Sequence, residues 1–268
     1  MQRKLLILLG VVLAIATIIS VAIVTYTPRE KESRTTTPLK IKEYIVYLPL
    51  PRIKGNMSVE EALAYRRSIR EYKEEPLTLF QLSQILWAAQ GISETKWGFR
   101  TCPSAGATYP LEVYVVVGEN GVIGLDAGVY HYDPYSHTLK LIKKGDYRKE
   151  LCKAGLEQPW ILNAPVNLVI AAEYERTTKR YGERGIRYVH MEVGHAGQNV
   201  YLEATALGLG TVVIGAFYDD QVREIIGAPR SQYPLYIIPV GVPEKKYRIS
   251  ESELWEYIEK NREKLNQQ

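Results

Sequence analysis

The stretch RYVHMEVGHAGQNVYLEATALGLGTVVIG, which spans residues 187–215, decides the fold that the sequence predicts. Its apolar residues recur at steps of three and four, which is the spacing of one helical face. Because a glycine inside a helix costs up to about 1 kcal/mol relative to alanine, another segment is expected to approach closely here. Gly208 and Gly210 end the helix, and residues 211–214 are expected to form a short buried strand. Small residues crowd the apolar face, namely Gly194, Ala196, Gly197 and Ala204.

A second, polar stripe runs along the same predicted helix and consists of Glu192, His195, Asn199 and Glu203. A long helix that is rich in small residues and runs into a buried strand is typical of a central element. The sequence therefore predicts a central helix against which the other elements pack.

Composition narrows the classes of protein to consider. The chain has 268 residues, of which 46% are hydrophobic and 24% charged, and this is typical of one large globular domain or two small ones. The net charge of +4 is mild, and no basic stripe is interleaved with aromatic residues, so nucleic acid is not an expected partner. Cys102 and Cys152 show no metal-ligand spacing, so no metal site is predicted, although a disulfide between them stays open.

The N-terminal segment from Leu5 to Val24 carries no charge, and twenty such residues can cross a hydrocarbon core of about 30 Å. The alternative is a cleaved signal peptide, whose apolar region is usually shorter, at about 7–15 residues. We predict a single-pass membrane anchor over residues 1–26 and a polar linker over residues 27–42. Basic residues on both sides of the segment leave the orientation open, with the domain expected outside the cytoplasm because the short tail is easier to retain inside.

A run of basic residues follows the first predicted helix, which a capping box at Ser58 and Glu61 begins. Three arginines and one serine stand within five residues, at Arg66, Arg67, Ser68 and Arg70. Guanidinium groups match phosphate oxygens with paired hydrogen bonds, so this run is a candidate anion site. The alternative is a solvated basic turn, which composition alone favours.

The segment from residue 96 to residue 112 is a loop rich in small and turn-forming residues. Residues 104–107 (SAGA) have no bulky side chain, so their backbone can lie flat against a planar ligand. The alternative is a simple connection into a buried strand at residues 113–117. Cys102 has no positioned base in the sequence and is expected to be a packed thiol, not a nucleophile.

The remaining elements indicate an α+β domain over residues 43–249, followed by an amphipathic helix over residues 250–268. Further capping boxes begin at Thr78 and Ser250, and buried strands are expected at residues 166–171 and 235–241. A β-hairpin is expected at residues 128–141, with its two histidines on a polar edge. The sequence contains no phosphate-binding loop, zinc pattern, dinucleotide fingerprint or hydrolytic triad motif.

Four segments in this order resemble the flavin-dependent nitroreductase family: RRSIREY (66–72), PSAGATYPLE (103–112), GHAGQNVYLEATALGLGTVVIG (194–215) and IPVGVPEKK (238–246). The second of them, with GVYHYD (128–133) and YGERGIRY (181–188), resembles the SagB-type branch. That branch is associated with dehydrogenation of thiazoline and oxazoline rings in modified peptides. The resemblance covers residues 58–246 and implies a nitroreductase-like mixed sheet flanked by helices.

The resemblance further implies an FMN enzyme that forms a homodimer, with each flavin at the subunit interface, NAD(P)H as the reductant, and a small molecule or peptide as the substrate. Because FMN carries the two-electron chemistry, such a protein needs binding groups and no catalytic triad. The implied contacts to the FMN phosphate and ribityl chain come from Arg66, Ser68 and Arg70, with Arg67 contributing its backbone. Additional charge at the phosphate is implied for Lys246 or Arg248, with Lys245 as the alternative.

The flavin ring is implied to lie between two backbone segments. Ile214, Gly215 and Ala216 would present their backbone beside the ring, and the partner subunit would cover it with Pro103, Ser104, Ala105 and Gly106. The same resemblance pairs the central helix with its copy in the second subunit.

One departure affects the expected reaction. Azoline-oxidising members of the branch share a Lys-Tyr pair, where this chain has Arg180 and Tyr181. Arginine is a poor general base because its pKa is too high. Tyr181 remains the candidate catalytic residue, while azoline dehydrogenation is in doubt. The alternatives to an FMN oxidoreductase are therefore an azoline-peptide dehydrogenase and a membrane-tethered, non-catalytic binding or assembly protein.

Overall fold

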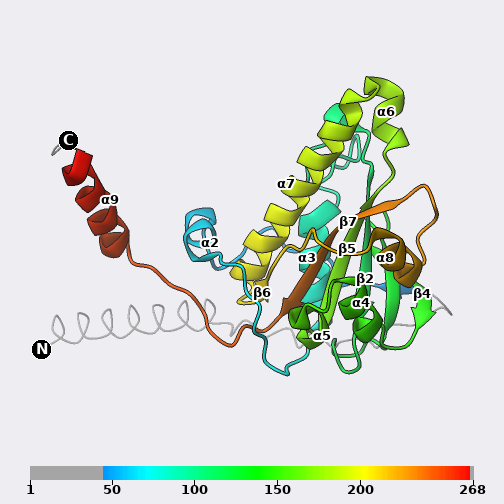
Figure 1. The fold of residues 1–268 in the computed structure, drawn as a ribbon, viewed down its shortest axis with the longest axis horizontal. Helices are drawn as coiled ribbons and strands as arrows, with labels where there is room; N and C mark the ends of the chain where they lie inside the picture. Colours follow the sequence, from blue (N-terminus) through cyan, green and yellow to red (C-terminus); the bar gives the residue numbers. More distant parts are fainter. Residues whose placement is uncertain (1–44, 266–268) are drawn as a thin grey trace, which may run out of the picture. The chain divides into compact units, whose positions relative to one another are not determined.

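The computed structural model describes residues 45–265 (Figure 1). The strands are β1 (Ile45–Tyr47), β2 (Leu111–Val117), β3 (Gly128–Asp133), β4 (Thr138–Lys144), β5 (Val166–Ala172), β6 (Gly210–Thr211) and β7 (Tyr233–Gly241). The helices are α2 (Val59–Tyr65), α3 (Leu79–Gln90), α4 (Arg148–Ala154), α5 (Pro159–Asn163), α6 (Glu175–Tyr181), α7 (Arg184–Ala206), α8 (Asp219–Ile226) and α9 (Glu251–Leu265), with a short 3-10 turn η1 (Ala105–Ala107).

The strands form one sheet in the order β1-β4-β3-β2-β5-β7-β6, and neighbouring strands run antiparallel. Isolated parallel bridges join Ser68 to Thr211 and Leu77 to Val122. Every residue of β5 is buried, which explains its continuous apolar sequence, because a strand covered on both faces has no polar side. The predicted α+β class is confirmed.

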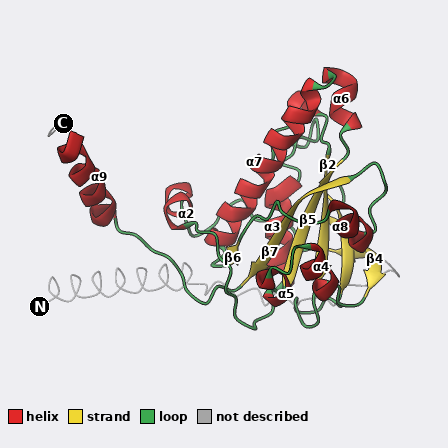
Figure 2. Ribbon diagram, in the orientation of Figure 1, coloured by secondary structure: helices red, strands yellow, loops and turns green. Residues whose placement is uncertain are grey.

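Helices cover both faces of the sheet (Figure 2). Side chains alternate along β2, so Val113 and Val115 join the core under α3 and α7, while Tyr114 and Val116 join the core under α4, α5 and α8. Fully burying one such aliphatic side chain contributes about 1.5–3 kcal/mol. The sheet is therefore stabilised on both faces. A site can form only where these helices leave the sheet uncovered, at the ends of its strands.

The three predicted capping boxes are present. In each box the first side chain accepts a hydrogen bond from a backbone N–H three residues later, and the later side chain accepts one from the backbone N–H of the first residue. The pairs are Ser58 with Glu61, Thr78 with Gln81, and Ser250 with Glu253.

The predicted central helix is α7, which contains 23 residues. Its buried face packs against α3 and the sheet through Val193, Ala196 and Val200, as the spacing predicts. A Cβ added to Gly197 would lie 3.3 Å from the Tyr236 ring, so a close neighbour explains this glycine. Gly194 differs, because a Cβ added there would meet no atom of the described chain within 4 Å.

The predicted strand at residues 211–214 is shorter in the structure. β6 contains only Gly210 and Thr211, and the chain returns to the sheet at Ile214, which bridges Ile237. The Val213 N–H donates instead to the hydroxyl of Tyr201, at 3.0 Å. A side chain of α7 therefore replaces the ladder hydrogen bond that a continuous strand would make.

The predicted transmembrane helix is not supported, and this part of the fold prediction is wrong. Within residues 45–265, no helix has the length and apolar character needed to cross a membrane. The longest, α7, carries Arg187, Glu192 and Glu203 along its length, and charged groups are costly in hydrocarbon. The apolar segment at residues 5–24 lies outside the described residues. The predicted membrane-anchored localisation is corrected together with the helix.

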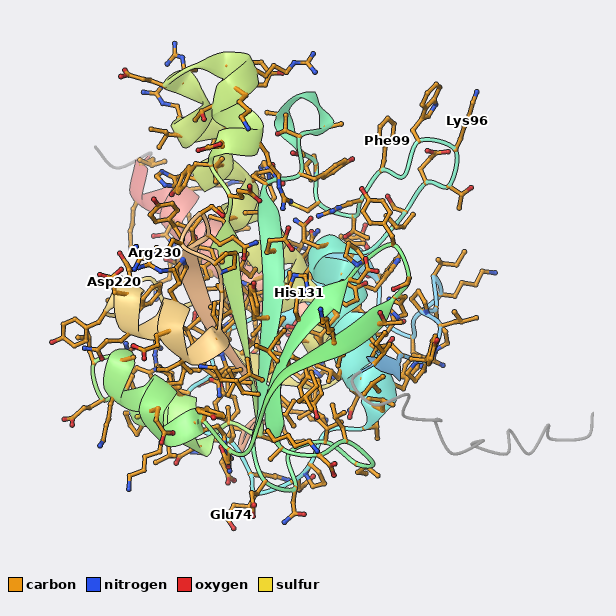
Figure 3. All side chains as sticks on the ribbon, turned by 90° about the vertical axis from the view of Figure 1, so that its right-hand side faces the viewer. Glu74, Lys96, Phe99, His131, Asp220 and Arg230 are labelled. Atoms are coloured by element: carbon orange, nitrogen blue, oxygen red, sulfur yellow. The ribbon has the colours of Figure 1, made fainter. Side chains whose placement is uncertain are left out.

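The hairpin of β3 and β4 is confirmed, but its histidines differ from each other. His131 lies on the sheet face that Figure 3 presents and pairs with Glu112 at 2.7 Å. His137 was expected on a polar edge, yet it lies between the Ser83 hydroxyl at 2.7 Å and the Tyr132 hydroxyl at 2.9 Å. Its burial lowers the pKa of the imidazole, so this histidine is held neutral as part of the packing.

Candidate functional site

The arginine segment lies along the end of the sheet. The Ile69 N–H donates to the Thr211 carbonyl at 2.9 Å, and Ser68 bridges Thr211 in parallel. A Cβ added to Gly210 would lie 2.7 Å from the Ile69 side chain, so only glycine allows this close approach. Residues 66–70 are thereby fixed as an extended segment and not as a free basic turn.

Tyr201 of α7 organises this segment. Its hydroxyl lies 3.0 Å from the Ser68 hydroxyl and accepts the Val213 N–H at 3.0 Å. The Arg66 guanidinium lies 4.9 Å from the centre of the Tyr201 ring, within range of a cation–π contact. The Tyr201 side chain therefore contacts Ser68, Arg66 and Val213 and fixes their positions relative to α7.

The three arginines have different surroundings. One terminal nitrogen of the Arg67 guanidinium, Nη1, donates to the carbonyls of Ala64 and Arg66 at 2.9 and 2.7 Å, so this side chain is held against the turn. Within the described part of the chain, the guanidinium groups of Arg66 and Arg70 make no hydrogen bond and no ion pair; Arg70 lies over the Trp160 ring at 5.3 Å. Their charges are not neutralised there.

The structure brings the second predicted cationic group to the same place. A small cavity of about 40 Å³ joins the arginine segment to residues 243–248 that follow β7. The Arg248 guanidinium lies 4.3 Å from the Tyr65 ring centre, at the end of α2. No acidic side chain among residues 45–265 pairs with these cations. The basic residues lining the cavity are Arg67, Lys245, Lys246 and Arg248.

The segment after β6 has an accessible backbone. Ile214 is buried and exchanges two backbone hydrogen bonds with Ile237, whereas Gly215 and Ala216 are exposed. The Ala216 carbonyl accepts from the Gln158 side chain at 3.2 Å. This anchored turn next to the sheet can therefore present backbone groups to a ligand.

The small-residue loop is held in an uncommon backbone conformation. Gly106, Ala107 and Tyr109 all have positive φ, at 62°, 53° and 45°. The Ser104 hydroxyl donates to Glu192 Oε2 at 2.6 Å and accepts the Tyr109 N–H at 2.9 Å. Figure 3 shows Lys96 and Phe99 on the loop that leads into this segment, pointing away from the sheet.

The candidate catalytic Tyr181 stands beside this loop. A Cβ added to Gly106 would lie 2.5 Å from the Tyr181 hydroxyl, which explains why glycine occupies that position. Arg180 donates to the Gly106 carbonyl at 3.2 Å, so it anchors the loop. Lys179 pairs with Glu175 at 3.2 Å on the exposed side of α6. Neither basic residue is therefore a free base next to Tyr181.

Within one chain the two halves of the predicted site stay apart. Ser68 contacts Tyr201 and Ser104 contacts Glu192, and these two residues of α7 are nine positions apart. At a helical rise of 1.5 Å per residue, nine positions correspond to about 14 Å. The structure thus joins the arginine segment, through Arg67 and Ile69, to residues 245–248, but it does not bring residues 103–106 to it.

Sequence reasoning missed two residues that organise the site. Tyr201 is one of 20 tyrosines in the chain, and no pattern separates it from the others. Glu192 was placed in a polar stripe of α7 without a role, although its side chain is buried and its residue only 2% exposed. The sequence offered one signal, a carboxylate that directly precedes the apolar Val193 and adjoins the small-residue face of the helix.

Comparisons with known proteins agree with this architecture. The family model described as the nitroreductase family matches residues 63–242. A protein of Methanocaldococcus jannaschii that carries the name nitroreductase is 54% identical over 194 residues, which cover 72% of this chain and 95% of that protein. The trifolitoxin-processing protein TfxB of Rhizobium leguminosarum bv. trifolii is 36% identical over 114 residues, which cover 41% of this chain and 30% of that protein.

A solved structure from Ralstonia eutropha, which also carries the name nitroreductase, superposes with a TM-score of 0.66 at 30% identity and covers 76% of this chain and 91% of its own. The family match extends over more than half of the chain and includes the arginine segment, the small-residue loop and α7. The predicted resemblance is confirmed: the chain belongs to the nitroreductase family of oxidoreductases.

Proposed function

We propose that the protein is an FMN-dependent oxidoreductase that accepts a hydride from NAD(P)H and delivers it to an organic acceptor. The observation that carries this proposal is that two adjacent segments carry cations without acidic partners in the described chain, Arg66 and Arg70 on one and Lys246 and Arg248 on the other. Arg67 and Ile69 of the first segment meet the second segment at the small cavity. Unpaired cations beside an exposed turn fit a bound phosphate. FMN would supply the two-electron chemistry, so the protein supplies binding and orientation.

Each element has a distinct part in holding the cofactor. Arg66 and Arg70 would bind the phosphate, while Arg67, whose guanidinium is engaged within the turn, would contribute backbone. Ser68, held by Tyr201, would donate its hydroxyl to the ribityl chain or phosphate. Lys246 and Arg248 would add charge from the segment after β7.

The ring would lie against residues 214–216, where Gly215 and Ala216 leave their backbone accessible. The opposite side would be covered by residues 103–106 of a second copy, because the two segments are about 14 Å apart along α7 within one chain. A two-fold arrangement with antiparallel copies of α7 would bring the loop of one copy to the arginines of the other. The exposed residues Ile186, Met191 and Gly194 lie along α7 and fit such a contact.

A second candidate function is azoline-peptide dehydrogenation. It is favoured by the similarity to a trifolitoxin-processing protein and by Tyr181, which stands at the loop that would cover the ring. Arg180 argues against it, because a guanidinium is always charged and this one donates to the Gly106 carbonyl. We therefore rank a hydride donor and a small organic acceptor ahead of an azoline peptide.

The test is anaerobic reduction of the bound flavin. Turnover numbers of enzymes are commonly about 1–1000 per second, so NADPH or NADH should bleach the flavin absorbance within seconds. Free FMN in the same buffer serves as the control. If flavin is bound but neither nucleotide reduces it, the protein is a non-catalytic flavin-binding protein and the proposed reaction is withdrawn.

A further inference from the structure

A buried carboxyl group lies under the small-residue loop. Glu192 is only 2% exposed, and its Oε2 accepts the Ser104 hydroxyl at 2.6 Å. Its Oε1 has no hydrogen-bond partner among residues 45–265, and the side chain makes no ion pair there. A buried carboxyl without a paired cation favours its neutral form, because burial penalises the charge.

Two more buried polar atoms without a partner belong to the same region. They are Nε2 of Gln90 and Nε of Arg100, and Arg100 also donates to Gln90 Oε1 at 3.0 Å. The Cys102 thiol lies among these groups and donates to the Glu192 carbonyl at 3.3 Å.

The surroundings of Glu192 set its protonation. Burial raises the pKa of this carboxyl to about 7, and the Ser104 hydroxyl and the Arg100 guanidinium act in the opposite direction. Cys102, directly before the loop, is a further titratable group, and its burial raises the pKa of its thiol to about 12, so it stays protonated. From α3 the neutral Gln90 faces the site. Glu192 is therefore the group here that changes charge near neutral pH.

Two hydrogen bonds through Ser104 fix the backbone of the small-residue loop at residues 103–109. Ala107 and Tyr109 have positive φ, a backbone conformation that residues other than glycine rarely adopt. The Tyr109 N–H donates to Ser104, and Ser104 donates to Glu192, so the hydroxyl is engaged on both sides. The single hydrogen-bond donor of the Ser104 hydroxyl is thereby used within the protein.

We propose that Glu192 is a positioning residue, which holds residues 103–109 in the conformation that covers the cofactor. The carboxyl fixes Ser104, Ser104 fixes the amide of Tyr109, and the chain between them presents a surface without bulky side chains. The role of Glu192 toward a cofactor rests on the proposed function. Its effect on the conformation of residues 103–109 is independent of that function.

The first test is hydrogen exchange at the Tyr109 amide in the full chain. Glu192→Ala and Ser104→Ala should both accelerate this exchange, and the double variant should be no faster than the faster single variant, because they break one chain of contacts. Glu192→Gln keeps an acceptor oxygen and should preserve protection. Glu203→Ala, a matched change on the same helix, should leave Tyr109 unchanged. Unaltered exchange in Glu192→Ala would overturn the proposal.

The second test measures the titration of Glu192 itself through the pH dependence of stability. The folded-state pKa of Glu192 lies above its ordinary value of 4.5, so the folded protein binds the proton more tightly and loses stability as pH rises from 4.5 to about 7. Relative to Glu192→Gln, the unfolding equilibrium constant of the unaltered protein should rise about tenfold per pH unit in that window. Identical pH profiles for the two proteins would contradict a titrating Glu192.

FMN affinity supplies the last readout. Glu192→Ala removes one neutral hydrogen bond to the loop and should weaken FMN binding about two- to tenfold. Glu192→Gln keeps an acceptor for this bond and should bind FMN as the unaltered protein does. An unaltered protein that binds no FMN would refute the proposed function alone, since the amide exchange would still report the hold on the loop. Normal FMN affinity in a folded Glu192→Ala would refute the positioning role toward the cofactor.

Discussion

Gly194→Glu is expected to convert the protein into monomers and to weaken FMN binding by about a hundredfold or more. Gly194 is exposed, and an added Cβ would meet no other segment of the described chain within 4 Å, so we expect the subunit to accommodate the substitution. In a two-fold pairing of α7, the two introduced carboxylates would be buried close together, and each site would lose the covering loop. A hundredfold corresponds to about 2.8 kcal/mol, the size of two or three hydrogen bonds.

Sedimentation velocity gives the oligomeric state of this variant, and flavin fluorescence gives its FMN affinity. The control is Gln221→Glu, which adds the same charge to an exposed position of α8. A Gly194→Glu protein that remains dimeric, with unchanged FMN affinity, would place the subunit contact elsewhere on the molecule.

The second large effect concerns Arg66. If its guanidinium binds the phosphate, Arg66→Ala should cost about 1.5–3 kcal/mol, the range for hydrogen bonds to charged groups. This is about a ten- to hundredfold loss of FMN affinity. Riboflavin, which has no phosphate, should be affected far less. Ser68→Ala should show the same pattern with a smaller loss, because it removes one neutral donor.

Arg67→Ala provides the matched control for Arg66→Ala. It removes the same charge, but the Arg67 guanidinium donates to the carbonyls of Ala64 and Arg66. Its effect on FMN should therefore be small and close to its effect on riboflavin. Titration with FMN and with riboflavin, followed by fluorescence quenching, gives the affinity of each variant for each ligand. Equal weakening of FMN and riboflavin by Arg66→Ala would mean that the fold, and not a phosphate contact, was damaged.

Local patterns predicted the elements of this fold well. The apolar spacing of α7 and the three capping boxes depend on residues within one or two helical turns, so the sequence contains the whole signal. The strand after α7 shows the limit. Val213 has a strand-forming sequence, yet its N–H donates to a tyrosine twelve residues earlier.

The site depends more strongly on distant contacts. Composition alone favoured a solvated turn for the arginines. Only the fold shows that residues 245–248 meet this segment at Arg67 and that no described acid pairs with its arginines. The bond from Ser104 to Glu192 spans 88 positions in the sequence and could not be predicted from spacing. The hydropathy of residues 5–24 suggested a membrane anchor, which no described helix supports.

The most direct measurement is the flavin content of the purified full-length protein. Belonging to the nitroreductase family sets the fold, whereas the proposed FMN site rests on the arginine segment and on the loop whose Ser104 hydroxyl donates to Glu192. The purified protein should be yellow, and denaturation should release FMN, at one molecule per chain. A colourless protein that also fails to bind added FMN would contradict the proposed function.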